Sequence, residues 1–147
     1  MELLVFEIAG TLCGVPTEFV CEVQRAVSLS AVPEAGQRVL GAMNLRGQMV
    51  LVLDLRGVIG AAPKPVAPSD HFLVIRCGAR LLAIRADRAR ELVRGEPSEI
   101  TDSTTVLPAA QFVTSVARVG DEFVHVLDPA RLGALADSTK SPLQYVE

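Results

Sequence analysis

The chain lacks an excess of basic residues, and this lack argues against binding to nucleic acid. Its 147 residues carry 14 Lys and Arg against 17 Asp and Glu, which gives a net charge of −3. Proteins that bind nucleic acid through electrostatics present a basic face or stripe. Half of the residues are apolar and 21% are charged, a balance typical of a globular domain. We therefore expect a globular protein with no nucleic-acid partner.

The sequence also lacks a long hydrophobic run, a secretion signal and paired cysteines. Its Met49–Leu53 run is far shorter than the roughly 18 apolar residues of a membrane-spanning helix. Met1–Leu4 contains no basic region of the kind that begins a signal peptide. Cys13, Cys21 and Cys77 are odd in number and show no Cys-x-x-Cys spacing, which favours free thiols in a reducing compartment. These features predict a cytoplasmic location without membrane insertion.

Residues suited to catalysis or metal binding are sparse. His71 and His125 have no carboxylate cluster at ligand spacing, so we expect no metal. No glycine-rich phosphate loop follows a strand, so we expect no cofactor. Two enzymatic alternatives remain: Cys21 as a nucleophile, or Asp54 and Asp128 as paired catalytic carboxylates. The two aspartates are better explained as helix caps or turn acceptors at the ends of strands.

An internal repeat is the most informative feature of the sequence. Leu4–Ile8 aligns with Leu73–Cys77, and Met49–Asp54 aligns with Phe123–Asp128, with apolar residues matched at almost every core-type position. Such self-similarity is the mark of repeated architecture. Cys13 and Cys77 align with apolar residues of the other copy, which predicts core positions for both. His125 also aligns with an apolar residue, so we expect it to be partly buried and structural.

A proline-rich stretch separates the two copies. Pro63, Pro65 and Pro68 lie between them, and this composition is typical of a linker. We expect one domain over 1–147, made of subdomain 1 over about 1–60, a linker over 61–70, subdomain 2 over about 71–136 and a C-terminal tail over 137–147.

The apolar periodicity within each copy is mostly that of β-strands. In the first copy it predicts hairpins within Leu3–Val15 and Val39–Asp54, and the second copy repeats this order. Between the hairpins, Pro16–Glu18 can open a short helix, and Arg85–Arg94 holds the matching stretch. The sequence therefore predicts an all-β fold of two subdomains with short helices.

One turn differs in chemistry between the two copies. Arg46 aligns with Gly120, so the second copy has no basic residue at this place. A residue that serves folding alone tends to be matched by similar chemistry in both copies. We therefore hypothesise a specific task for Arg46; the alternative is a solvated arginine in a turn.

Two stretches of the first copy resemble a known family. The run Gly41–Arg56 is similar to the signature of the CheW-like domain family, and Val20–Arg25 resembles the Val-x-Glu-Val stretch that precedes it. The resemblance extends over about Leu3–Leu135. It implies two five-stranded SH3-like β-barrels packed side by side. It also implies a non-catalytic adaptor that couples methyl-accepting chemoreceptors to a CheA-type histidine kinase.

The resemblance also implies which residues contact partners. The receptor's helical signalling tip would bind near the first barrel, and the kinase's regulatory domain would bind barrel ends. The matching positions in this sequence are Val20, Glu22, Val23, Asn44, Arg46 and Gly47. Because the resemblance places Glu22 and Arg46 at the same groove and their charges are opposite, we expect these two residues to lie close together at the edge of the first barrel. Two positions depart from the family pattern: Leu51 replaces a common proline, and Pro129 follows Asp128. An accessory protein that binds receptors without coupling to a kinase is the alternative function.

Overall fold

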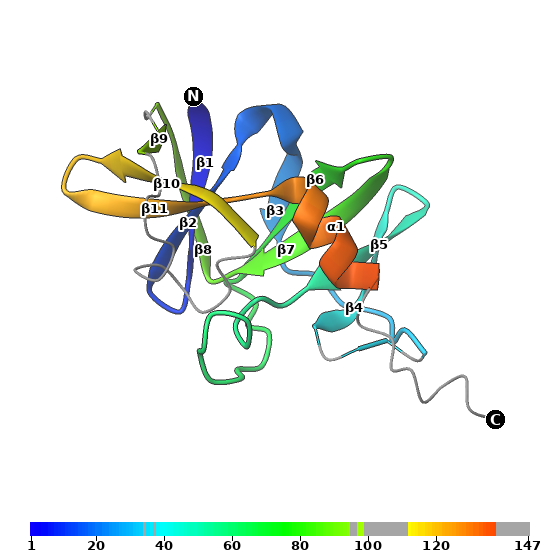
Figure 1. The fold of residues 1–147 in the computed structure, drawn as a ribbon. Helices are drawn as coiled ribbons and strands as arrows, with labels where there is room; N and C mark the ends of the chain where they lie inside the picture. The colour runs from blue at the N-terminus through cyan, green and yellow to red at the C-terminus, as the bar shows by residue number, and fades with distance from the viewer. Residues whose placement is uncertain (34, 37, 95–96, 99–111, 138–147) are drawn as a thin grey trace, which may run out of the picture.

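The computed structural model describes all residues except 34, 37, 95–96, 99–111 and 138–147, and it contains two β-barrels side by side (Figure 1). The strands, in chain order, are β1 (Glu2–Ile8), β2 (Thr11–Pro16), β3 (Val20–Arg25), β4 (Val39–Leu45), β5 (Gln48–Leu53), β6 (His71–Cys77), β7 (Arg80–Ala86), β8 (Arg88–Arg94), β9 (Pro97–Ser98), β10 (Val113–Val119) and β11 (Glu122–Leu127). A 3-10 helix, η1 (Thr17–Phe19), precedes β3, and the α-helix α1 (Pro129–Asp137) follows β11. The predicted all-β class with short helices is confirmed.

Each barrel is one curved sheet. The central barrel contains β3–β7 in the order β3-β6-β7-β5-β4, and a bridge between Ser30 and Ala42 joins the chain after β3 to β4. The terminal barrel contains the remaining strands in the order β8-β1-β2-β11-β10-β9. Its short β9 comes after β8 in the chain and pairs with β10. Each barrel therefore has five long strands. In each barrel, the segment that follows one edge strand pairs with the strand at the opposite edge.

The division of the chain between the barrels differs from the prediction. We expected subdomains over about 1–60 and 71–136, but β1 and β2 belong to the terminal barrel, while β6 and β7 belong to the central one. The two copies thus exchange their first hairpins. The stretch 61–70 connects β5 to β6 within the central barrel, so it is not a linker between barrels. The predicted tail lies outside the described residues, apart from Asp137, which ends α1.

The exchange preserves a two-fold relation between the copies. Strand β3 pairs with β6 so that Glu22 lies opposite Val74, and β8 pairs with β1 so that Glu91 lies opposite Val5. Both pairings contain a bulge at the equivalent place. In the same way, β5 runs parallel to β7 and β11 runs parallel to β2. Equivalent sequences can pair in this reciprocal way because the strands of both copies have the same spacing of apolar residues, so a hairpin fits against either set of strands.

The main hydrophobic core spans the boundary between the barrels. It combines side chains from β1 and β2, such as Phe6 and Cys13, with side chains from β6 and β7, such as Leu73 and Leu82. Cys77 is buried in the same cluster, which confirms the predicted core positions of both cysteines. Each barrel also has a smaller core of its own.

The helix predictions between the hairpins are wrong except for one turn. Only Thr17–Phe19 is helical, and the chain then continues as the strand β3. The matching stretch Arg85–Arg94 lies within β7 and β8. Exposure along β3 alternates from residue to residue, which is the period of a strand. The sequence does not show this period as an apolar alternation, because the polar Glu22 and Gln24 are half-buried while Val23 is exposed.

The helix α1 follows β11 and begins at the cap that the sequence indicated for Asp128, although our sequence analysis did not use Pro129 as a start signal. The carboxylate of Asp128 accepts a hydrogen bond from the amide of Ala130, as an N-cap does, and Pro129 occupies the first helical position. Leu132 and Leu135, three residues apart, are buried against the main core. The helix lies against β6 and covers one side of the central barrel (Figure 1).

Candidate functional site

The hairpin between β4 and β5 presents Arg46 at the tip of a tight turn. Arg46 and Gly47 both have left-handed backbones, with φ of 50° and 87°. Two such residues between paired strands form a type I′ turn, which matches the twist of a hairpin. The side chain of Asn44 accepts a hydrogen bond of 2.8 Å from the amide of Gly47, which fixes the turn. Asn44 and Gly47 therefore fix the turn conformation that sets the direction of the Arg46 side chain.

Strand β3 brings Glu22 to the same place. Its bulge lies between Val20, opposite Ile75, and Glu22, opposite Val74. The side chain of Arg46 donates from Nη2 to Oε1 of Glu22 over 2.7 Å. The predicted proximity of Glu22 and Arg46 at the edge of the barrel is confirmed.

The ion pair is exposed unevenly. The Arg46 side chain is 75% exposed and that of Glu22 is 27% exposed, so the guanidinium dominates the surface. An exposed ion pair of this kind adds about 0–1 kcal/mol to stability. Folding therefore gains little from the pair, and most of the guanidinium surface is accessible to a partner.

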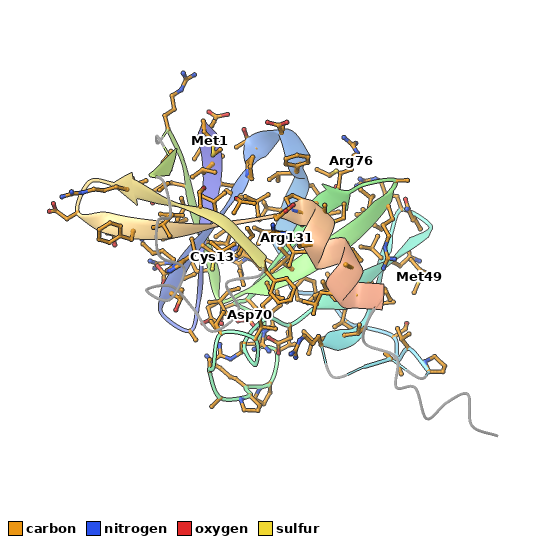
Figure 2. The ribbon with its side chains drawn as sticks, viewed as in Figure 1. Met1, Cys13, Met49, Asp70, Arg76 and Arg131 are labelled. Carbon is orange, nitrogen blue, oxygen red and sulfur yellow. The ribbon has the colours of Figure 1, made fainter. Side chains whose placement is uncertain are left out.

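Apolar side chains lie on the strand and the hairpin that carry the two residues of the ion pair. Val20 is half-buried and packs against the main core, whereas Val23 is 38% exposed. Met49, on β5 opposite Asn44, is 55% exposed and lies beside the hairpin (Figure 2). Sequence reasoning did not single out Met49, although it precedes the buried Val50 in an alternating strand and is therefore expected to face outward.

The equivalent turn of the terminal barrel contains glycine. Gly120, with φ of 61°, holds the place of Arg46. Arginine in this conformation costs roughly 1–2 kcal/mol more than in its usual one, whereas glycine adopts it freely. The fold therefore does not require arginine at this turn, and the comparison favours a specific task for Arg46.

The terminal barrel has an ion pair of opposite polarity at the equivalent edge. There the strand β8 supplies Arg90, and the β10–β11 hairpin supplies Glu122, 3.5 Å away. Arg90 also approaches Glu7 and Glu91, at 3.7 Å and 3.3 Å. This reversed pair was not predicted, because Arg90 aligns with Cys21 in the repeat. The two barrels thus place acid and base in opposite order at this edge.

The residues of the enzymatic alternatives have structural surroundings. Asp54 accepts from the amide of Arg56 and pairs with Arg85, while Asp128 accepts from the amide of Ala130. The predicted roles as turn acceptors and caps are confirmed.

Two further side chains have the structural roles that the sequence indicated. Burial raises the pKa of Cys13 to about 12 and that of Cys77 to about 11, so both thiols stay protonated and unreactive. His125 is half-buried with its ring nitrogen 3.1 Å from the carbonyl of Leu12, which confirms its predicted structural position. Cys21 is exposed on β3.

The described part of the chain contains no cluster of three or more metal-ligating side chains. Within the same residues, no helix is long and apolar enough to cross a membrane.

The family model of the CheW-like domain matches residues 2–136. The chain belongs to this family. It is 23% identical over 128 residues to the chemotaxis protein CheW of Helicobacter pylori, which covers 86% of this chain and 78% of that protein. It is 29% identical over 93 residues to the protein FrzA of Myxococcus xanthus, which covers 63% of this chain and 58% of that protein.

A solved structure agrees with the fold. The crystal structure of the scaffolding protein TtCheW from Thermoanaerobacter tengcongensis matches with a TM-score of 0.73 and 23% identity, over 86% of this chain and 83% of that one. The match confirms the SH3-like architecture of two subdomains.

Proposed function

We propose that this CheW-like chain is a non-catalytic scaffold that couples methyl-accepting chemoreceptors to a CheA-type histidine kinase. The observation that carries the proposal is the exposed Arg46, held in an unfavourable backbone conformation where the equivalent turn uses glycine. The names of its relatives support a role in chemotaxis-like signalling. Receptor signalling tips lie in the cytoplasm, and the proposal places the chain there too.

The receptor's helical tip binds at the edge of the central barrel. Val20, Glu22, Val23, Asn44, Arg46 and Gly47 form this surface. A helix can place apolar side chains against Val23 and an acidic or amide group against Arg46. The rim charge then sets orientation and partner choice more than raw affinity. Asn44 and Gly47 act by holding the turn, not by contact.

The kinase's regulatory domain binds a different surface from the receptor tip. Two partners must be held at once for coupling, and the chain has two barrels that place acid and base in opposite order at equivalent edges. The reversed ion pair of Arg90 and Glu122 gives the terminal barrel a surface distinct from that of the central barrel.

A reconstituted signalling assay tests this function. Receptor fragments, a CheA-type kinase and this chain are mixed, and kinase autophosphorylation is measured with and without the chain. Receptor-dependent control of the kinase only in the presence of the chain supports coupling. Receptor binding without any effect on the kinase supports the alternative, an accessory protein. No binding to either partner contradicts both.

A further inference from the structure

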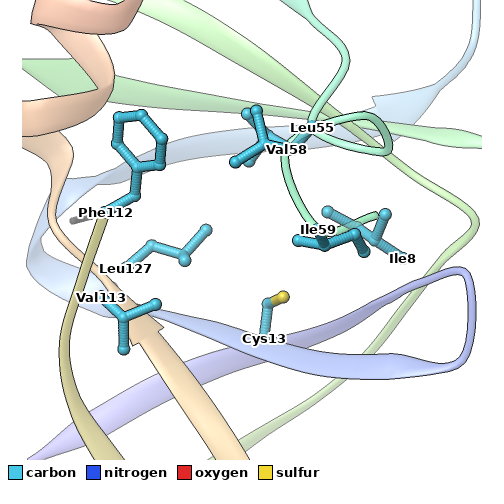
Figure 3. Close-up of a pocket in the computed structure, with 8 residues that line it drawn as sticks. All are labelled: Ile8, Cys13, Leu55, Val58, Ile59, Phe112, Val113 and Leu127. Atoms are coloured by element: carbon cyan, nitrogen blue, oxygen red, sulfur yellow. The ribbon is translucent and has the colours of Figure 1, made fainter. Parts of the chain in front are cut away.

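The segment of residues 54–70, here called the strap, leaves the central barrel after β5 and returns to it at β6. Between these points it lies against the terminal barrel. Its side chains Leu55 and Val58 are 3% and 8% exposed and belong to the main core. Figure 3 shows Leu55, Val58 and Ile59 around a small apolar cavity between the strap and the terminal barrel. The other residues that line this cavity are Ile8, Cys13, Phe112, Val113 and Leu127.

A buried arginine ties both ends of the strap to the central barrel. Arg85, on β7, is 1% exposed and pairs with Asp70 at 3.0 Å and with Asp54 at 3.2 Å. Its remaining donors reach the backbone carbonyls of Lys64 and Pro65, at 2.6 Å and 2.8 Å. Every contact of this arginine therefore holds the strap on its own barrel.

A second arginine ties the strap to the other barrel. Arg56 donates from Nη1 to both carboxylate oxygens of Asp87, at 3.0 Å and 3.2 Å, and from Nε to the carbonyl of Ala62. Asp87 lies at the crossover from β7 to β8, where the chain passes from the central to the terminal barrel. Its carboxylate also accepts a hydrogen bond of 2.7 Å from the amide of Ala9, in the β1–β2 turn.

These contacts differ in kind from the rest of the boundary. The main core between the barrels is apolar, and apolar contact is favourable in many orientations because it has no direction. Hydrogen-bonded ion pairs, in contrast, constrain both distance and angle.

We propose that the Arg56–Asp87–Ala9 contact, here called the clasp, fixes the orientation of the terminal barrel relative to the central barrel. The strap is the arm that carries Arg56 to the clasp, and Arg85 anchors that arm. The Arg56 and Asp87 side chains are 11% and 27% exposed, so water and salt reach the clasp, whereas Arg85 and Asp70 are sealed at 1% and 3%. Of the two sets of contacts, the clasp is therefore the one that opens first. This inference concerns the isolated chain and does not depend on the proposed partners.

Spin-label distances between the barrels test the clasp. Met49 on β5 and Phe123 on β11 are both exposed. Their hairpins, β4–β5 and β10–β11, lie at opposite ends of the molecule (Figure 1). Each of the two residues is replaced by a labelled cysteine in a chain that also carries Cys21→Ser. The buried Cys13 and Cys77 stay unlabelled because of their raised pKa values.

We expect one narrow distance distribution in this labelled parent and a broadened or two-component distribution in Arg56→Gln. The matched control is Arg88→Gln, because the exposed pair of Arg88 and Glu7 lies close by but entirely within the terminal barrel. The amide of Ala9 gives a second readout: its hydrogen exchange should become about ten-fold faster in Arg56→Gln and stay unchanged in the control.

The proposal is overturned if Arg56→Gln keeps the narrow distribution and the slow exchange, or if Arg88→Gln broadens the distribution equally. If Arg56→Gln does not fold, Asp87→Asn replaces it, since this variant keeps the shape of the side chain and removes the charge. Titrating the labelled parent with salt adds an independent arm. A distance distribution that broadens as the salt concentration rises supports the clasp. A distribution that stays narrow both in the parent at high salt and in Asp87→Asn contradicts it.

Discussion

Arg46 and Gly120 occupy equivalent positions in two hairpins related by the internal two-fold, and both have left-handed backbones, with φ of 50° and 61°. The same turn is therefore built once with arginine and once with glycine. Because only the arginine pays the steric cost of this conformation, the pair of positions allows the task of Arg46 to be separated from folding.

The first prediction exchanges these two residues separately. Arg46→Gly relieves roughly 1–2 kcal/mol of backbone strain, but loses about 0–1 kcal/mol from the ion pair with Glu22 and gives the unfolded chain more freedom, worth about 0.4–1 kcal/mol. We expect the free energy of unfolding to change by less than about 1 kcal/mol in urea. Affinity for a receptor tip should fall by about ten-fold or more, as for the loss of one interface contact.

The mirror variant is the control for this prediction. Gly120→Arg introduces the strain beside Glu91, the counterpart of Glu22, which already pairs with Arg90 at 3.3 Å. A new exposed ion pair there offsets little of the strain, so the variant should be destabilised by about 1 kcal/mol. Its affinity for the receptor tip should equal that of the wild type. If Arg46→Gly binds the tip normally, Arg46 is a turn residue only.

The second prediction concerns the buried arginine of the strap. Arg85→Met leaves Asp70, 2% exposed, without its partner, and two strap carbonyls without a donor. Breaking a buried ion pair in this way costs about 3–5 kcal/mol, so we expect a large decrease in the urea midpoint. Lys64→Met is the control, because only its backbone carbonyl takes part in the contact, and it should unfold like the wild type.

Much of the fold could be predicted from the sequence, because strand hairpins are local. Hairpins such as Val39–Asp54 follow from alternating apolar residues and a turn of two residues. Which hairpin joins which barrel could not be predicted. The repeat shows that two segments are alike, and alike segments fit either barrel equally well.

The contacts of the candidate site and of the strap also fall into those that the sequence predicted and those that it did not. The proximity of Glu22 and Arg46 was predicted from a family resemblance and from their opposite charges. The contacts of Arg85 and Asp70 were not predicted, because they depend on how a strap of irregular backbone folds over a strand. An arginine inside a strand that otherwise reads as buried, as in β7, is nevertheless a signal that could have been used.

The third prediction concerns thiol reactivity. The pKa of Cys13 is raised to about 12 and that of Cys77 to about 11, so neither forms a thiolate in the native protein near neutral pH. Native protein treated briefly with iodoacetamide should take up one adduct, at Cys21, and denatured protein should take up three. Rapid modification of Cys13 in the native state would contradict the described core.

The same pKa shifts predict a pH dependence of stability. The thiol pKa is 9.0 before folding and higher in the folded state, so the folded protein binds more protons between these values. This contribution to stability is fully present below pH 9 and is lost as the pH rises towards 12. Cys13→Ala should make the urea midpoint less dependent on pH in that range.

The last prediction reverses charges at the proposed receptor surface. Arg46→Glu and Glu22→Lys each place like charges at the edge of the central barrel, where the native pair is 2.7 Å apart. Because the pair is exposed, each change should lower the free energy of unfolding by only about 1 kcal/mol. Binding should weaken more strongly, since a like charge opposite a partner's charge opposes association and orientation.

The double variant Arg46→Glu with Glu22→Lys restores the pair with reversed polarity. Stability should return close to that of the wild type, because the contact within the chain is rebuilt. Affinity should return only in part, because the exposed member of the pair is now an acid facing a partner that fits a base. Melting temperature and receptor-tip affinity are measured on the same samples. Full recovery of affinity in the double variant would mean that the partner recognises the shape of the turn and not its charge. Unchanged affinity in both single variants would mean that the receptor does not bind at the edge of the central barrel.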